Sequence, residues 1–184
     1  MKITMRRGRR GVGLVEFALV LPLLLILIVN VVNFGGFFFD WITVQNAART
    51  GAQYAILGGV SVGAPKEADS TKIAAVLAAD LLSLKNSTSY KGQVCTKTPS
   101  GPGTSSATVT TTCTSIGAGG GTFPAAPPND GRAEADHYST TWIDVTYTFN
   151  PLIPLGFKFP RLNLYATLPG NLNIHRRAVM RMIR

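Results

Sequence analysis

Residues 15–40 of the 184-residue chain read VEFALVLPLLLILIVNVVNFGGFFFD, and this stretch decides the architecture. The 23 positions from 17 to 39 carry no charged side chain. A helix needs about 20 mostly apolar residues to cross a bilayer, so the run is long enough. Pro22 lies inside it, but a membrane-spanning helix tolerates a proline that would break a helix in water. The stretch therefore predicts one membrane-spanning helix.

The charges beside this run predict its orientation. Five of the 18 basic residues fall within the first ten positions, namely Lys2, Arg6, Arg7, Arg9 and Arg10. Asp40 follows the run directly, so the positive-inside rule puts the N-terminus in the cytoplasm and the remainder outside. A cleaved secretory signal is the alternative. Its apolar core would be about 7–15 residues long and would end at a small-x-small site, whereas this run is longer and lacks such a site.

The overall composition fits an anchored protein better than a freely soluble one. The chain is 46% hydrophobic and 15% charged, whereas about 25% charged is usual for a soluble domain. Its net charge of +9 would suit a nucleic-acid binder, but such a protein presents a basic face interleaved with aromatic residues. Here the densest basic cluster abuts the apolar run, so we expect no nucleic-acid partner.

A specific pattern marks the start of the apolar run. The basic leader ends at Gly11, the apolar Val12 follows, and Glu16 is the fifth residue counted from Val12, with Phe17 after it. A carboxylate that enters a bilayer is costly, so it is by default a functional candidate whose partner has to be found. The alternative is a glutamate at the membrane edge that reaches water.

This pattern resembles the processing site of type IV prepilins, and the extended sequence resembles the TadE-like pseudopilins of tight-adherence (Flp) pilus systems. The resemblance is carried by Gly13–Pro22 with the aliphatic run behind it, by Gln45–Ala55, and more weakly by Arg177–Arg181 near the end. Thr50 departs from the pattern, because an acidic residue often follows the arginine of the second motif in this family. Residues 58–139 carry no motif of the family.

The resemblance implies a non-enzymatic, minor pilin-like protein that a membrane prepilin peptidase cuts after Gly11. Cleavage would remove every leader charge and create an ammonium group at Val12. Glu16 of one subunit would then pair with the Val12 amine of its neighbour, since a buried carboxylate without a partner is expensive. The implied partners are the peptidase, other pilins or pseudopilins, the inner-membrane pilus assembly platform and the lipid bilayer. The implied location is the bacterial inner membrane, single-pass, with a periplasmic or extracellular C-terminal domain.

The remaining patterns predict an α+β protein in three segments: a basic leader over 1–11, a transmembrane and assembly helix over 12–58, and an exported domain over 59–184. Helical spacing over 41–57 continues the span, and a second helix over 71–84 has Asp69 or Ser70 as its cap. Strand patterns predict a small, mainly antiparallel sheet built from 89–96, 107–114, 138–150, 161–168 and 171–182. A Gly- and Pro-rich segment at about 115–135 predicts a flexible loop.

The two cysteines predict one disulfide. Cys95 and Cys113 fall in neighbouring predicted strands of an exported domain, where a disulfide is expected to form and persist. Two free thiols are the alternative. A metal site is not expected, because the pair lacks clustered histidines.

Catalytic candidates are poor, so we expect no enzyme and no cofactor. Asp136, His137 and Ser139 lie close in sequence, but a hydrolase triad is recognised by geometry and not by proximity in the chain. His175 stands beside Arg176 and Arg177. The C-terminal arginines at 176, 177, 181 and 184 are interpreted as the solvated face of a final strand, and contact with anionic lipid headgroups or an acidic partner is the alternative.

Two rival functions remain open from the sequence. One is a pseudopilin of a type II secretion or conventional type IV pilus system. The other belongs to a different class, an exported binding module whose uncut N-terminus serves as a signal anchor. An exported enzyme has no supporting site.

Overall fold

The computed structural model describes residues 12–57, 60–61, 64–65, 69–100, 108–118, 121–124, 138–154, 158–159, 164–165 and 167–183. The predicted leader over 1–11 lies outside these residues. The chain divides into two compact units: residues 1–37 with 151–170, and residues 38–150 with 171–184. We call them the first and the second unit.

One long helix, α1, runs from Val12 to Leu57. It confirms that the apolar run continues without a break into the predicted helix over 41–57. Pro22 lies inside the helix. A proline leaves a backbone carbonyl of the preceding turn without its helical partner, and a membrane-spanning helix tolerates this because other groups can bond to that carbonyl. By length and composition, the helix from Gly13 onward is able to cross a membrane.

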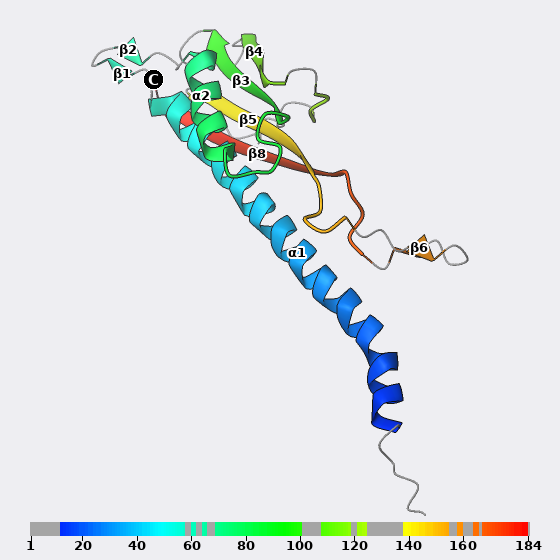
Figure 1. The fold of residues 1–184 in the computed structure, drawn as a ribbon. Coiled ribbons are helices and arrows are strands. Elements are labelled where there is room, and N and C mark those ends of the chain that lie inside the picture. Colours follow the sequence, from blue (N-terminus) through cyan, green and yellow to red (C-terminus); the bar gives the residue numbers. More distant parts are fainter. Residues whose placement is uncertain are drawn as a thin grey trace, which may run out of the picture. The chain divides into compact units, whose positions relative to one another are not determined.

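The second unit is built around an antiparallel sheet in the order β4-β3-β5-β8 (Figure 1). Its strands are β3 (Lys91–Ser100), β4 (Thr108–Gly117), β5 (Tyr138–Phe149) and β8 (Leu172–Ile183). The predicted α+β class is therefore confirmed, and four of the five predicted strands form this sheet. Cys95 lies directly opposite Cys113 in the register, with Cα atoms 4.1 Å apart, and the two are bonded as predicted.

Helices cover one face of this sheet. On β5 the side chains alternate between the faces, and the covered face presents Ile143, Val145, Tyr147 and Phe149, each at most 1% exposed. Helix α2 (Ser70–Leu81) buries Ile73, Leu77 and Leu81. Asp69 caps it by accepting a hydrogen bond from the Thr71 amide. Hydrogen bonding from the Thr71 side chain, and then from its amide, holds the pKa of the Asp69 carboxyl below its ordinary value. The predicted helix over 71–84 thus ends three residues early.

The C-terminal half of α1 packs on the same core through small residues. Val44, Ala47, Ala48, Ala52 and Ala55 are at most 1% exposed. A Cβ atom added at Gly51 would lie 3.0 Å from Ile143 Cδ1 and 3.1 Å from Leu77 Cδ2. Glycine at this position therefore allows the helix backbone to approach both the sheet and α2.

Short strands account for the remaining elements. In the second unit, β1 (Val60–Ser61) pairs with β2 (Ala64–Pro65). In the first unit, β6 (Lys158–Phe159) pairs with β7 (Leu164–Tyr165). The predicted strand over 161–168 is wrong as part of the main sheet, because its described strand residues pair only with β6. The predicted loop at 115–135 begins inside β4, and most of it lies outside the described residues.

Substitution of Gly51 by valine should destabilise the second unit, because the added atoms would overlap Ile143 and Leu77. Overpacking of this kind costs about 1–3 kcal/mol. Thermal unfolding of the full chain in detergent would measure the loss. The matched control is Gln53→Val, which adds valine at an exposed position of the same helix. Equal melting temperatures for the two variants would contradict the packing described here.

Candidate functional site

The predicted processing and assembly residues lie at the start of α1. Gly11 lies outside the described residues, and Val12 opens the helix. Glu16 and Phe17 are both exposed on the helix surface. The sequence places no other charged residue between Val12 and Phe39. Glu16 is thus a single carboxylate on an otherwise uncharged helical surface.

Within the first unit, most of the surface of this helical segment is uncovered. Most of the large apolar side chains from Leu14 to Phe34 are between 38% and 75% exposed, including Leu14, Phe17, Leu19, Leu23, Leu27 and Val31. A contiguous apolar surface of this kind marks a membrane or protein contact. The structure therefore provides one helix compatible with a single-pass membrane anchor.

Two asparagines interrupt the apolar surface, and both have hydrogen-bond partners. Asn30 Nδ2 donates to the Ile26 carbonyl at 2.9 Å, one turn earlier in the same helix. Asn33 is completely buried. Its Nδ2 donates to the Ile153 carbonyl at 3.0 Å, and its Oδ1 accepts from the Ile153 amide at 3.0 Å. Asn33 therefore ties the chain at Ile153 to α1 within the first unit.

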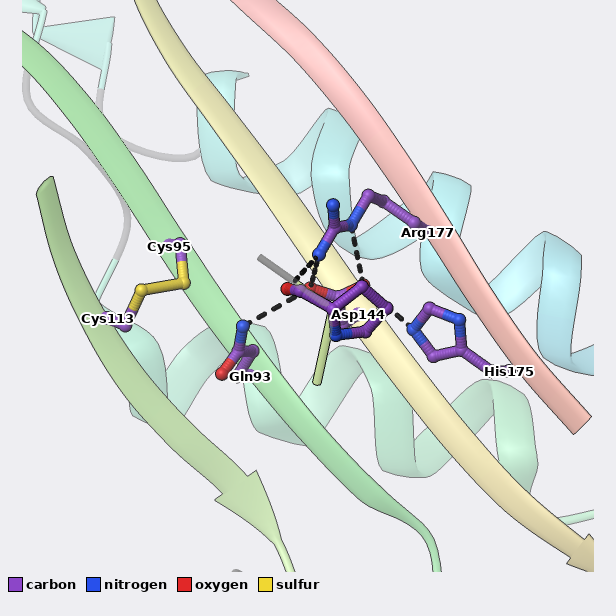
Figure 2. A network of polar contacts seen from close by, with 7 residues as sticks. Gln93, Cys95, Cys113, Asp144, His175 and Arg177 are labelled. Atoms are coloured by element: carbon purple, nitrogen blue, oxygen red, sulfur yellow. Dashed lines mark hydrogen bonds and ion pairs between the residues drawn. A yellow bond between two sulfur atoms is a disulfide. The ribbon is translucent and has the colours of Figure 1, made fainter. Parts of the chain in front are cut away.

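A second polar cluster lies in the sheet of the second unit, on the face opposite the helices (Figure 2). Its centre is Asp144, whose side chain is fully buried. Arg177 donates from Nε to Oδ1 at 2.8 Å and from Nη2 to Oδ2 at 2.9 Å. His175 Nε2 lies 2.9 Å from Oδ1, and Gln93 Nε2 donates to Oδ2 at 3.3 Å. One carboxylate therefore joins strands β3, β5 and β8.

Residues 123–124 and a hollow lie next to the Asp144 cluster. Arg177 Nη2 also donates to the Pro124 carbonyl at 2.7 Å, and the Phe123 ring centre lies 6.4 Å from that of His175. Beside His175 is a hollow of about 480 Å³, whose lining includes Lys91, Thr122, Thr146, Thr148 and Asn173. The bidentate pair between Arg177 and Asp144 has a fixed geometry, so the cluster holds the strands in place.

The cluster also corrects the interpretation of the C-terminal arginines. Arg177 holds the buried Asp144, and Arg176 lies 3.3 Å from the centre of the Trp41 ring, a cation–π contact. The prediction of a purely solvated face is therefore wrong for these two residues. Sequence reasoning missed Asp144 altogether. The available signal was a lone carboxylate between Trp142 and Val145, inside the most apolar strand pattern of the exported part.

Three of the remaining sequence candidates fall where the structure does not describe their side chains. Asp136 and His137 lie outside the described residues, and the side chain of Ser139 is not described. Within the described ranges, no three His, Cys, Asp or Glu side chains are grouped so that they could hold a metal ion. Both cysteines are engaged in the disulfide.

Comparison with known proteins places a family signature on the N-terminal part. Residues 11–53 match the family model described as TadE-like protein. The match begins at the predicted cleavage position, includes Glu16, and extends to the small-residue face of α1 that packs on the sheet. No curated protein and no solved structure matches the chain. The resemblance to TadE-like proteins is therefore confirmed for this segment.

Replacement of Arg177 by methionine should strongly destabilise the second unit, because it leaves the Asp144 carboxylate buried without its bidentate partner. Breaking a buried ion pair from one side typically costs about 3–5 kcal/mol. Denaturant unfolding of Arg177→Met, Asp144→Asn and the double variant would measure the coupling. We expect the double variant to be more stable than Arg177→Met alone.

The control for this cycle is Arg181→Met on the same strand, where the arginine is exposed. Exposed ion pairs contribute about 1 kcal/mol or less, so the loss at Arg181 should be correspondingly small. Equal losses at positions 177 and 181, with no recovery in the double variant, would contradict the assigned pairing.

Proposed function

We propose that this chain, TadE-like over residues 11–53, is a minor pilin-like subunit of a tight-adherence pilus that a prepilin peptidase cuts after Gly11. The observation that carries the proposal is the exposed apolar half of α1 with Glu16 as its single charge. The TadE-like match over the same residues supports it. The protein acts as a structural and assembly component, and it has no catalytic role of its own.

The proposed location is the bacterial inner membrane. The five basic residues before the span favour a cytoplasmic N-terminus, and the disulfide of the second unit favours an oxidising compartment beyond the membrane. The span holds the subunit in the bilayer before assembly. Its partners are then the prepilin peptidase, other pilins or pseudopilins, and the assembly platform in the same membrane.

Glu16 has a proposed role in setting the register between subunits. Cleavage after Gly11 places a new ammonium group four residues before Glu16. In a bundle of such helices, the Val12 amine of one subunit would neutralise Glu16 of the next. A carboxylate buried among apolar helices is expensive unless it is paired, so the pair would penalise any subunit that docks in the wrong register.

The second unit has the proposed role of the exported domain. The strands of its sheet are linked by a disulfide between β3 and β4 and by the Asp144 cluster across β3, β5 and β8. These links make it a rigid body suited to capping or display at the fibre surface.

Processing is tested first, by intact mass and N-terminal sequencing of the membrane-extracted protein from cells that contain a prepilin peptidase. We expect a chain that begins at Val12. Gly11→Val should abolish the cut, because the peptidase needs close access to the backbone at a residue without a side chain. Gly13→Val is the matched control, since an atom added at Gly13 meets nothing within 4 Å. A native chain that begins at Met1 would favour the uncut, signal-anchored module instead.

The register role is tested by Glu16→Gln. The variant should still be inserted and cut, but its incorporation into sheared pilus fractions should fall at least about tenfold, the equivalent of 1.4 kcal/mol. Asp80→Asn, which removes an exposed carboxylate of the second unit, is the control. Incorporation of Glu16→Gln at the wild-type level would refute the pairing while leaving processing untouched.

A further inference from the structure

The hydrogen bonds of Asn33 fix a distant piece of chain on the apolar half of α1. The amide group of Asn33 pairs reciprocally with the backbone of Ile153, which is 120 residues further along the chain. Both bonds measure 3.0 Å, and the Asn33 side chain is completely buried. The amide thus satisfies both backbone groups of Ile153 in the way that a neighbouring strand would.

The position of Asn33 along the helix sets the depth of this contact. Asn33 lies 17 residues after Glu16, which corresponds to about 26 Å of helix at 1.5 Å per residue. The hydrocarbon core of a bilayer is about 30 Å thick. With Glu16 at one edge of the core, Asn33 lies just inside the other edge. Ile153, which is paired to Asn33, therefore lies at the far membrane–water boundary in such a placement.

The four residues around Ile153 are suited to that boundary. Residues 151–154 read Pro-Leu-Ile-Pro, so two of them have no backbone N–H group. The N–H group of Ile153 is satisfied by Asn33, which removes one of the two that remain. Unsatisfied backbone donors are what normally keep irregular chain out of lipid. Leu152 is 54% exposed, so the segment also presents an apolar side chain to its surroundings.

The sequence that follows has the composition of an interfacial segment. Residues 157–165 read FKFPRLNLY, a mixture of aromatic and basic residues. Tyrosine, here Tyr165, is enriched at the membrane–water boundary, and basic side chains such as Lys158 and Arg161 are attracted to anionic headgroups.

We infer that residues 151–154 form a second membrane contact, an interfacial segment that Asn33 holds against α1 at the outer boundary of the hydrocarbon core. The inference rests on the proposed function in one respect, namely that α1 spans the bilayer. Its partner is the lipid itself. The contact fixes how far α1 slides across the membrane before the subunit enters a fibre, because the segment resists both deeper insertion and withdrawal into water.

The experiment uses the full chain reconstituted in phosphatidylcholine/phosphatidylglycerol vesicles. An environment-sensitive fluorophore is attached at Leu152→Cys, and quenching is measured with lipids that carry a nitroxide at a shallow or a deep position of the acyl chain. We expect at least twofold stronger quenching by the shallow nitroxide than by the deep one. Ile28→Cys on the exposed apolar helix reports insertion of the span, and Asp80→Cys on α2 reports a position in water.

A pair of matched variants tests the role of Asn33. Asn33→Leu removes both hydrogen bonds to Ile153 and should reduce quenching at position 152 to the level of position 80. Thr43→Val removes a hydrogen bond to the Phe39 carbonyl within the helix itself and should leave quenching at position 152 unchanged. Unchanged quenching at position 152 in Asn33→Leu would overturn the role of Asn33.

The outcomes separate this inference from the proposed function. Absence of quenching at position 28 would overturn the membrane-spanning helix and with it both proposals. Quenching at position 28 without quenching at position 152 would overturn the interfacial segment alone and leave the anchor intact. A blue-shifted but unquenched fluorophore at position 152 would show a protein contact in place of lipid, and it would also overturn the inference.

Discussion

The main constraint on this protein is that a single helix carries two different apolar surfaces, one exposed and one packed. Up to Phe37, α1 exposes Leu, Ile, Val and Phe side chains over most of its surface, which water does not accommodate. Large exposed residues continue as far as Ile42, and from Val44 onward the helix buries alanines and Gly51 against a sheet. The change from large to small apolar residues along one helix therefore determines where its exposed apolar surface ends and its packed part begins.

Much of the architecture follows from local patterns in the sequence. The uncharged run and the helical spacing over 41–57 predict α1, and alternation of Thr, Val and aromatic residues predicts β3, β4 and β5. The alternation that begins with Leu172, Ile174 and Arg176 predicts β8. Periodicity is a local property, so such elements can be recognised without knowledge of the fold. The disulfide could also be predicted, because Cys95 and Cys113 fall one in each of two neighbouring predicted strands of an exported domain, and the register places them opposite each other.

The features that could not be predicted depend on contacts between distant residues. Asn33 and Ile153 are 120 positions apart, and no local pattern marks either as the partner of the other. Asp144 occupies a polar position in the alternating pattern of β5, so the pattern by itself does not indicate that it is buried. Its burial depends on β8, which places Arg177 beside it. The residues of 161–168 have strand-like alternation, yet the described pair β6–β7 lies outside the main sheet. Alternation specifies a strand but not the strand with which it pairs.

The placement of the Asp144 partners has a consequence for the order in which the domain can be completed. Arg177 and His175, which both contact this carboxylate, lie on β8, the last strand in chain order, whereas Asp144 itself lies on β5. During synthesis the helix and the first strands leave the ribosome well before residues 172–183. Until those residues arrive, the carboxylate has no counter-charge from β8 and favours an open, hydrated sheet. A chain interrupted before β8 would bury Asp144 only at a large cost in free energy, so the sheet is expected to form fully only when β8 is present.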